Sequence, residues 1–410
     1  MKKLLLVLLI LSLFINHLNA NEKDLNIIQK DKKEYRLLEK ESIQTRQQSQ
    51  KYDWISPIDL SGNIGRNHSF SDENSRNLNN KNTKSASIGF TQSIFESGGI
   101  GFKMDYADNR FKYEMLSWEN QNSQLIYTIY NTLLDIKKLK LEINQNEYRI
   151  VNKDIELIIK KIQYEAGKTD IIELNNAIMS KNLILKEEIA LKNSLKEKEQ
   201  ELAKYTDLKY DEIEILDFQE TNKDIFLDKN YSILEADAKV EMLNSEYKIK
   251  KSQYLPKLSL SAKASYSNQD EKFNSMINDT NKDDASSSGS LILSMPLYDY
   301  TKSSKIQESK IEVLKQKSLV NDLKNETAFE YEQIFTKIDT YLKQNETINK
   351  NIKLYEELIG ANQISSEAGM TSKYDLEILE NTKTINEFDI LINKINILQQ
   401  YAKLYFKIKN

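Results

Sequence analysis

The chain of 410 residues contains no cysteine, only three prolines, ten glycines and two histidines. Without cysteine there can be no disulfide, no thiol nucleophile and no cysteine metal site, and we expect no lipoprotein anchor. Proteins average about 7% glycine and about 5% proline, so turn-forming residues are scarce here. This scarcity predicts long, uninterrupted helices and strands.

Residues that could carry out catalysis are also scarce. Once residues 1–20 are set aside, His68 is the single histidine, and its polar surroundings are typical of a solvated loop. The sequence has no glycine-rich phosphate loop, and paired acids such as Glu187 and Glu188 are typical of a helix surface. We therefore expect no enzyme activity, no metal site and no cofactor.

The first twenty residues have the pattern of a secretory signal. Lys2 and Lys3 precede an apolar run from Leu4 to Ile15, and a small residue, Ala20, ends the segment. The run is shorter than the ~20 residues that span a bilayer, so we expect cleavage near residue 20 and export. Residues 1–20 hold two of the 58 basic residues and none of the 62 acids, which leaves a net charge of −6. This charge argues against nucleic-acid binding.

The remaining sequence repeats one plan twice. "WISPIDLSGNIG" around Pro57 matches "QYLPKLSLSAKA" around Pro256, and "YEAGKTDIIEL" at 164–174 matches "SEAGMTSKYDL" at 366–376. The offsets, 199 and 202 residues, are nearly constant, which indicates a duplication. We predict a first repeat at 21–205, a linker at 206–228 and a second repeat at 229–410.

Each repeat is predicted to contain a helix, two strands, a very long helix and a further helix, a mainly α fold with β. The predicted helices are 24–51, 100–165, 170–205, 229–252, 302–366 and 372–408, and the predicted strands are 55–68, 84–95, 257–268 and 287–297. The last helix carries two apolar stripes, one through Phe388 and Phe406 and one through Ile397 and Leu404. Two stripes predict a partner helix on each side, although burial in an ordinary bundle is the alternative.

Alternation with a period of two identifies the strands. In the third strand Leu258, Leu260 and Ala262 share one face, and the opposite face is polar; it consists of Lys257, Ser259, Ser261 and Lys263. Polar loops are expected at 71–82 and 270–284. Aromatic residues cluster at the other strand ends: Trp54, Phe95, Tyr254, Tyr298 and Tyr300. They suit either a membrane-interface girdle or packing where strand meets helix.

Strands of about ten residues can cross a bilayer when tilted. A strand in hydrocarbon cannot leave an unpaired edge, because no water satisfies its backbone groups. Four strands cannot close on themselves. Eight strands from two copies form a barrel that side chains fill, and twelve strands from three copies leave an open lumen. The face of Lys257 and Lys263 is then expected to line that lumen.

These features together resemble the TolC family of outer-membrane efflux proteins. The resemblance covers the whole chain after residue 20, and its carriers are "LPKLSLSAKASY", "SMPLYDYTKSSKIQESKIEV", "TQSIFESGG" and the paired "EAGKTDIIEL" and "EAGMTSKYDL". It implies a homotrimer in outer-membrane lipid, with a 12-stranded β-barrel, four strands per chain, joined to a 12-helix periplasmic tunnel. It also implies passive export through a tripartite efflux pump or type I secretion system, with a periplasmic adaptor and an inner-membrane transporter.

The resemblance also implies roles for the two turns. Gly167 and Thr169, with Gly369 and Thr371, are expected at the periplasmic tip that the adaptor contacts. Glu173 and Asp375 are expected to form acidic rings at the entrance, with Lys168 and Lys373 nearby. Helix capping explains the same residue types: glycine ends a helix, and Asp170–Glu173 and Ser372–Asp375 resemble capping boxes. One well-known member has a basic residue where Thr371 stands, so different closing contacts are expected.

Two other functions agree with parts of the sequence. A periplasmic adaptor also has long helical hairpins, but it has one hairpin and glycine-rich β domains, whereas this chain has two hairpins and little glycine. A coiled-coil structural protein has no need of four alternating strands. The sequence does not indicate which substrate is exported.

Overall fold

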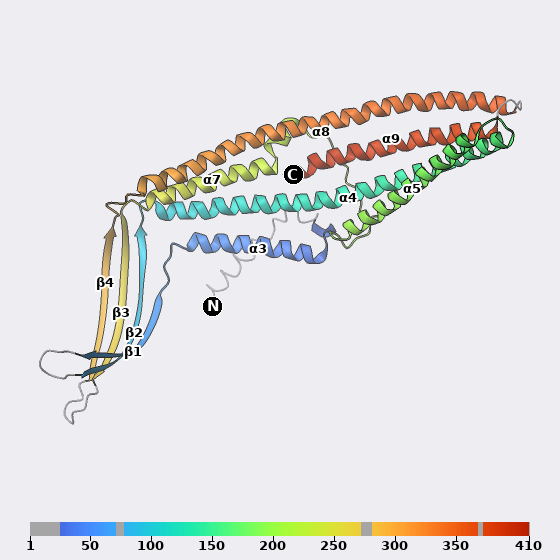
Figure 1. The fold of residues 1–410 in the computed structure, drawn as a ribbon. Coiled ribbons are helices and arrows are strands. Elements are labelled where there is room, and N and C mark those ends of the chain that lie inside the picture. Colours follow the sequence, from blue (N-terminus) through green and yellow to red (C-terminus); the bar gives the residue numbers. More distant parts are fainter. Residues whose placement is uncertain (1–24, 71–77, 272–280, 368–371, 410) are drawn as a thin grey trace, which may run out of the picture. The chain divides into compact units, whose positions relative to one another are not determined.

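The computed structural model describes residues 25–70, 78–271, 281–367 and 372–409, and it contains long helices and one four-stranded sheet (Figure 1). The helices are a short 3-10 helix η2 (Leu25–Ile27), α3 (Lys30–Tyr52), α4 (Gly99–Glu165), α5 (Ile171–Leu202), α6 (Lys223–Asp228), α7 (Tyr231–Ser252), α8 (Lys302–Glu367) and α9 (Lys373–Lys407). The strands are β1 (Asp59–Phe70), β2 (Leu78–Phe95), β3 (Lys257–Glu271) and β4 (Asn281–Ser294). The predicted mainly α fold with β is confirmed.

Some observed boundaries differ from the predicted ones. β2 begins at Leu78 and β4 at Asn281, so parts of the predicted loops 71–82 and 270–284 belong to strands. Apart from Leu78 and Ala285, these extensions consist of polar residues and carry no alternating signal. β1 begins at Asp59, not at residue 55, since Pro57 has no N–H for a ladder. The short helix α6 in the linker was not predicted. The expected signal segment at 1–20 lies outside the described residues.

The sheet is antiparallel throughout, with the strand order β1-β2-β3-β4. The register joins Leu60 to Ile88, Ile88 to Ala264 and Leu258 to Leu293, so the predicted apolar positions share one face. β1 and β4 are the two edges of this sheet, and neither has a second strand partner within the described residues. No described helix is both long enough and apolar enough to cross a membrane.

The chain separates into two compact units. One, the helical unit, comprises Met1–Lys40, Leu116–Glu235 and Asn321–Asn410, and the other, the sheet unit, comprises Glu41–Met115 and Ala236–Val320. Each unit takes segments from both predicted repeats. The repeat boundaries themselves therefore stay a prediction.

In the helical unit four helices form a layer in the order α5–α4–α9–α8. Lys181 of α5 pairs with Asp154 of α4. Gln145 of α4 donates from Nε2 to Asp389 Oδ1 of α9 at 2.7 Å. α9 in turn contacts α8 through an ion pair of 3.0 Å between Lys383 and Glu356.

Both predicted stripes of α9 are confirmed. The ring of Phe388 lies 5.9 Å from that of Tyr148 on α4. On the other side of α9, Leu404 packs in a cluster with Ile334 and Ile338 of α8. α9 therefore has a partner helix on each side, as the two stripes predict.

The core of the helical unit contains an aromatic hub, defined here as Tyr127, Tyr130, Phe218, Tyr405 and Phe406. Within it the rings of Tyr130 and Phe406 stack with centroids 5.5 Å apart, and Phe218 meets both rings edge-on. Four aliphatic side chains of α4 beside it are fully buried, namely Ile129, Leu133, Leu134 and Ile136. This packing joins α4 to the end of α9.

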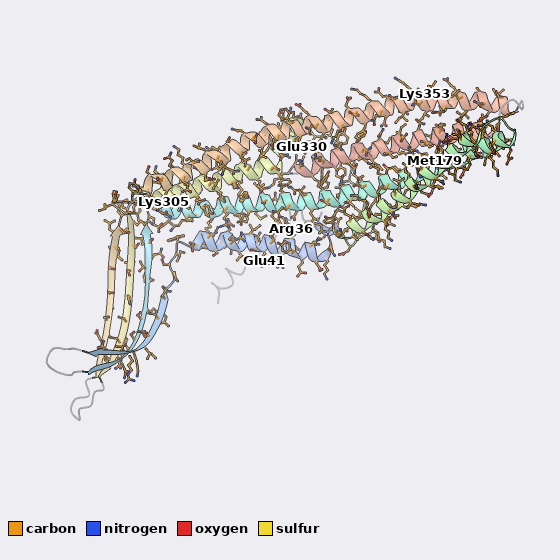
Figure 2. The ribbon with its side chains drawn as sticks, viewed as in Figure 1. Arg36, Glu41, Met179, Lys305, Glu330 and Lys353 are labelled. Atoms are coloured by element: carbon orange, nitrogen blue, oxygen red, sulfur yellow. The ribbon has the colours of Figure 1, made fainter. Side chains whose placement is uncertain are left out.

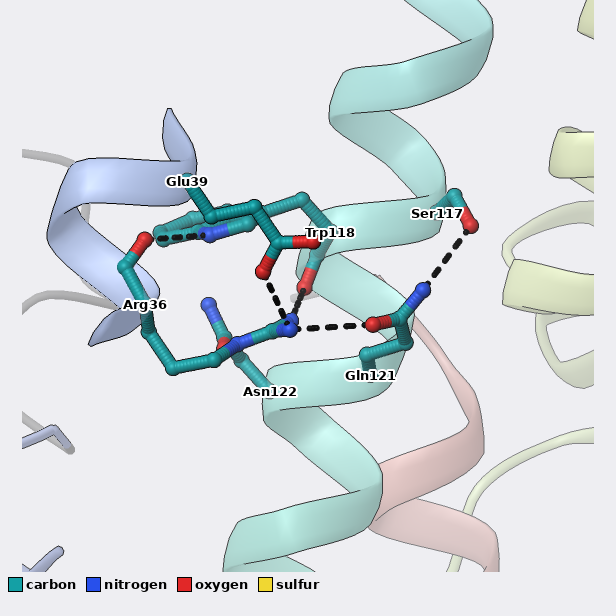
Figure 3. A network of polar contacts seen from close by, with 6 residues as sticks. All are labelled: Arg36, Glu39, Ser117, Trp118, Gln121 and Asn122. Atoms are coloured by element: carbon teal, nitrogen blue, oxygen red, sulfur yellow. Dashed lines mark hydrogen bonds and ion pairs between the residues drawn. The ribbon is translucent and has the colours of Figure 1, made fainter. Parts of the chain in front are cut away.

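A polar network attaches the start of α3 to α4 (Figure 3). The buried guanidinium of Arg36 donates to Asn122 Oδ1 at 2.6 Å, to Gln121 Oε1 at 2.9 Å and to the carbonyl of Trp118 at 3.0 Å. It also pairs with Glu39 at 2.6 Å. The indole Nε1 of Trp118 donates back to the carbonyl of Arg36 at 2.8 Å. Each of the two helices thus donates a side-chain hydrogen bond to the backbone of the other.

Candidate functional site

The predicted lumen face of the sheet is rich in hydroxyl groups. Ser259, Ser261, Lys257 and Lys263 lie on one face of β3, as the alternation predicts. Hydroxyl pairs link all four strands on this face: Ser61–Ser87 at 2.8 Å, Thr91–Ser261 at 3.1 Å, Ser93–Ser259 at 3.3 Å and Ser265–Ser286 at 2.8 Å. Such a face suits contact with water.

The same face is hollowed near its centre. A depression of about 440 Å³ is lined by residues of β1, β2 and β3, among them Asp59, Ser87, Thr91 and Lys263. Gly89 lies in this lining, and a side chain there would come within 3.0 Å of the carbonyl of Ala262. The depression is therefore lined by hydroxyl groups and by the ammonium group of Lys263.

The opposite face of the sheet is apolar and uncovered. Leu60 and Ile64 of β1 are 78% and 83% exposed, and Leu291 and Leu293 of β4 are also exposed. An apolar surface of this kind is unusual in water and suits contact with lipid or with another protein. Apart from the polar strand extensions before residues 84 and 287, the sheet therefore has one polar face and one apolar face.

The aromatic residues at the strand ends do not share one environment. Tyr298, Tyr300 and Phe95 are exposed, as a girdle requires. Tyr254 is buried, and the ammonium group of Lys302 lies 5.4 Å from its ring centroid. The girdle interpretation therefore suits Tyr298, Tyr300 and Phe95, whereas packing explains Tyr254.

The first turn of the helical unit has the geometry that its glycine predicts. Gly167 has a positive φ of 68°, its N–H donates to the Tyr164 carbonyl, and the N–H of Lys168 donates to the Gln163 carbonyl. These two bonds form the helix-ending motif that favours glycine, because a side chain is strained at this φ. The structural role of Gly167 is thereby explained.

Glu173 is bound differently from the predicted capping box. The carboxylate of Asp170 accepts the backbone N–H of Glu173 at 2.9 Å, which caps α5 as expected. The Glu173 carboxylate accepts instead from Lys160 Nζ of α4 at 2.8 Å. Glu173 is thus partly neutralised, and it stays accessible at the start of α5.

The second turn begins α9 in a similar way. The hydroxyl of Ser372 accepts from the N–H of Tyr374 at 3.2 Å, so Ser372 caps the helix. Lys373 and Asp375 are exposed in the first turn, at the same end of the helical unit as the start of α5 (Figure 1). Gly369 and Thr371 lie outside the described residues. The structure thus brings the candidate groups of both repeats to one end.

Several buried polar residues were not predicted from the sequence. Arg36 lies between exposed apolar neighbours, and Gln145, Asn152 and Asn393 lie at helix contacts that are usually apolar. A polar residue within a seven-residue apolar stripe is the signal that could have found the last three. Among the described residues, no group of three or more histidines and acids could hold a metal ion.

Residues 224–403 match the family model described as "Outer membrane efflux protein". No curated protein matches the chain. The matched family is one of transport proteins and not one of enzymes. The predicted resemblance is confirmed.

Solved outer-membrane channels share the fold of the chain. The outer membrane protein VceC of Vibrio cholerae is 12% identical, with a TM-score of 0.71 over 94% of this chain and 93% of that chain. CmeC of Campylobacter jejuni is 13% identical, with a TM-score of 0.69 over 92% and 84%. The open state of MtrE from Neisseria gonorrhoeae is 10% identical, with a TM-score of 0.65 over 91% and 85%. At such identities these likenesses show the fold alone.

Proposed function

We propose that this chain, an outer membrane efflux protein and so an exit duct of the outer membrane, works as a homotrimer in a tripartite efflux pump or type I secretion system. The observation that supports the trimer is a sheet with one apolar and one polar face, whose edge strands β1 and β4 each lack a second strand partner among the described residues. Its apolar face suits lipid, and its hydroxyl face suits a water-filled lumen. The partners would be a periplasmic adaptor and an inner-membrane transporter.

The edges of the sheet require further copies of the chain. Backbone groups at β1 and β4 need partners in hydrocarbon, because water is absent there. Pairing β4 of one copy with β1 of the next supplies those partners, and three copies close a barrel of twelve strands. A twelve-stranded barrel is wide enough to keep an open lumen. Lys257, Ser259, Ser261 and Lys263 would line it.

The two outer helices of the layer, α5 and α8, support the same assembly. α5 exposes Ile172, Met179 and Leu183, of which Met179 is labelled in Figure 2, and α8 exposes Leu354, Leu358 and Ile364. These two sets of exposed apolar residues lie at a similar distance in sequence from the turns. Leu183 lies 16 residues after Gly167, and Leu354 lies 15 residues before Gly369. Packing α5 against α8 of the next copy would cover both sets of exposed apolar residues.

Cysteine cross-linking tests the trimer directly, because the chain has no cysteine of its own. With Leu183→Cys and Leu354→Cys in one chain, oxidation should give covalent trimers on non-reducing gels. Leu183→Cys with Leu342→Cys is the matched control, since Leu342 is also exposed on α8 but lies at another depth. Equal cross-linking of both pairs, or monomers only, would contradict the proposed packing.

Fractionation tests the duct independently. The protein should fractionate with the outer membrane and run as a trimer that heat dissociates. Recovery as a soluble periplasmic monomer would refute the duct and favour an adaptor.

Glu173 and Asp375 are the proposed acidic rings at the entrance. Three copies would present each carboxylate three times, and rings of this kind attract cations. Glu173→Ala with Asp375→Ala should weaken block by multivalent cations in planar bilayers. Lys160→Met should strengthen block, because it removes the cation that pairs with Glu173. Unchanged block in both variants would leave Glu173 only its ion pair with Lys160 and would refute the proposed rings.

Adaptor contact is proposed for the same end of the helical unit. Gly167, Thr169, Gly369 and Thr371 are the candidate contacts, and Lys168 and Lys373 lie beside them in sequence. Thr169→Arg should reduce co-purification of the adaptor, because a long charged side chain enlarges the turn. Unchanged recovery of the adaptor would remove this turn from the proposed contact.

A further inference from the structure

The apolar face of the sheet is hollowed where all four strands pass. A hollow of about 430 Å³ lies there, and this apolar hollow is lined by three large side chains, those of Leu60, Ile88 and Tyr266. Small residues complete the same face of its lining: Ala86, Ala264, Ala285 and Ser287. A hydrocarbon chain in such a hollow meets apolar atoms on several sides, which a flat surface does not offer.

A lysine lies on this face directly beside the apolar hollow. Lys84 precedes Ala86 by two residues on β2, and the register pairs it with Ile64 on one side and with Asn268 on the other. Its side chain is exposed, and it forms no ion pair with any residue that the structure describes. An ammonium group is costly in hydrocarbon, so Lys84 needs an anion or the water of the head-group region.

The position of Lys84 along the sheet places it at the margin of the hydrocarbon. The apolar face begins with the pair Leu258–Leu293, beside the start of the helices, and Asn268 lies ten residues farther along β3. Ten residues span about 33 Å along a strand, or about 25 Å across the bilayer at a tilt of about 40°. The apolar band of outer-membrane barrels is about 25 Å tall. Since the helices extend into the periplasm, Lys84 faces the outer leaflet.

Two other charged side chains lie at this margin. Asp283 of β4 accepts hydrogen bonds from Tyr266 Oη at 2.9 Å and from Asn268 Nδ2 at 2.6 Å, so its carboxylate is already bonded within the sheet. Arg66 is exposed on the same face of β1, two residues beyond Ile64. The described side chains therefore make the margin basic on β1 and β2, and the acid of β4 lies across β3 from Lys84.

We propose that the apolar hollow and Lys84 bind a phosphorylated lipid of the outer leaflet, with an acyl chain in the hollow and a head-group phosphate at the ammonium group of Lys84. Lipid head groups carry their negative charge chiefly as phosphate, which complements the basic margin. An amphipathic occupant is required because the hollow and the lysine follow one another along the same strand. The site lies within one chain, so it rests on the outer-membrane location and not on the trimer.

Lipid A provides a probe for the head group. Purified protein in an uncharged detergent is titrated with diphosphoryl lipid A and with lipid A stripped of its phosphates, and native mass spectrometry counts the bound lipids. The phosphorylated form should bind at least about fivefold more tightly, since a lysine near a membrane surface contributes about that factor. Lys84→Gln should lower the affinity for the phosphorylated form about fivefold and leave the affinity for the stripped form unchanged.

Lys263→Gln is the matched control, because it removes the same charge from the opposite face of the sheet. It should leave the affinity for both forms unchanged. Equal affinity of the unmodified protein for the two forms, or equal effects of Lys84→Gln and Lys263→Gln, would overturn the proposal. Displacement of the lipid by excess inorganic phosphate would also overturn it, because the site would then bind a free anion.

A second pair of variants tests the acyl chain. Ala264→Phe fills the apolar hollow, and it should lower the affinity for both forms about tenfold while the preference for the phosphorylated form persists. Ala262→Phe places the same side chain on the same face of β3 but outside the lining of the hollow, and it should leave the affinities unchanged. Equal effects of the two variants would overturn the role of the hollow.

These outcomes are independent of the proposed trimer. Lipid binding as expected, together with failure of the Leu183→Cys and Leu354→Cys cross-link, would refute the packing of copies and leave the lipid site standing. Covalent trimers that show no preference for the phosphorylated lipid would refute the lipid site alone.

Discussion

Replacing Arg36 by methionine should destabilise the helical unit by about 2 kcal/mol. The substitution removes the donor to Asn122 Oδ1, and Asn122 Nδ2 is already buried without a partner. An unsatisfied buried amide costs about 1–3 kcal/mol. Loss of the guanidinium 5.9 Å from the Trp118 ring adds about 0.5–1 kcal/mol.

Part of this cost is offset because the substitution removes a charge that is unfavourably buried in the native protein. Burial is the main reason that the pKa of Arg36 is lowered, and the nearby Glu39 carboxylate opposes that effect. Methionine avoids the desolvation of the charge, so the net loss is smaller than the sum of the two costs. With an m-value of about 3 kcal/mol/M, a loss of ~2 kcal/mol lowers the urea midpoint by about 0.7 M.

Tryptophan fluorescence provides the assay. The chain has two tryptophans, so a Trp54→Phe background leaves Trp118 as the reporter beside Arg36. Arg46→Met is the matched control, because Arg46 also joins α3 to α4, through Glu114 at 2.9 Å, but its side chain is 44% exposed. An exposed ion pair contributes less than about 1 kcal/mol. Equal midpoints for Arg36→Met and Arg46→Met would refute the reasoning.

Two further predictions concern a glycine and an ion pair. Gly167→Ala should destabilise by about 1–2 kcal/mol because of its positive φ, whereas Gly360→Ala, within α8 and facing open space, should stabilise by about 0.5–1 kcal/mol. The thermal midpoint should fall for Gly167→Ala and rise for Gly360→Ala, and a change in the same direction in both variants would contradict this explanation. Burial opposes ionisation of Glu330, but bonds from Lys403 and Lys407 prevail and lower its pKa. Its stabilisation is therefore present above the ordinary pKa of 4.5 and lost as pH falls through the lowered value. Glu330→Gln should thus cost about 1–2 kcal/mol at pH 7 and progressively less as the pH falls below 4.5 in urea titrations, and a difference independent of pH would exclude this role.

Long elements were predictable from the sequence because their signals are local. The predicted helix at 302–366 is observed as α8, Lys302–Glu367, since 65 residues without proline leave nothing to interrupt it. The strand faces followed from alternation at Leu258 and Leu260, which the register confirms. The polar extension of β2 before residue 84 was missed, because backbone pairing alone forms it.

The candidate site was predictable in part. The glycine cap at Gly167 and the capping residues Asp170 and Ser372 followed from residue type and position. The bond from Lys160 to Glu173 did not follow, because its partners lie on two helices that meet only after folding. The burial of Arg36 was also hidden, since exposed Tyr35 and Leu37 beside it reverse the usual pattern.

The sequence by itself determined which segments are helices and strands and which face of each is apolar, because periodicity acts over a few neighbouring residues. The tertiary structure decided which helices meet and which polar groups they bury. Gln145 and Asp389 stand 244 residues apart, and they bond because a buried amide must find a partner wherever packing places it.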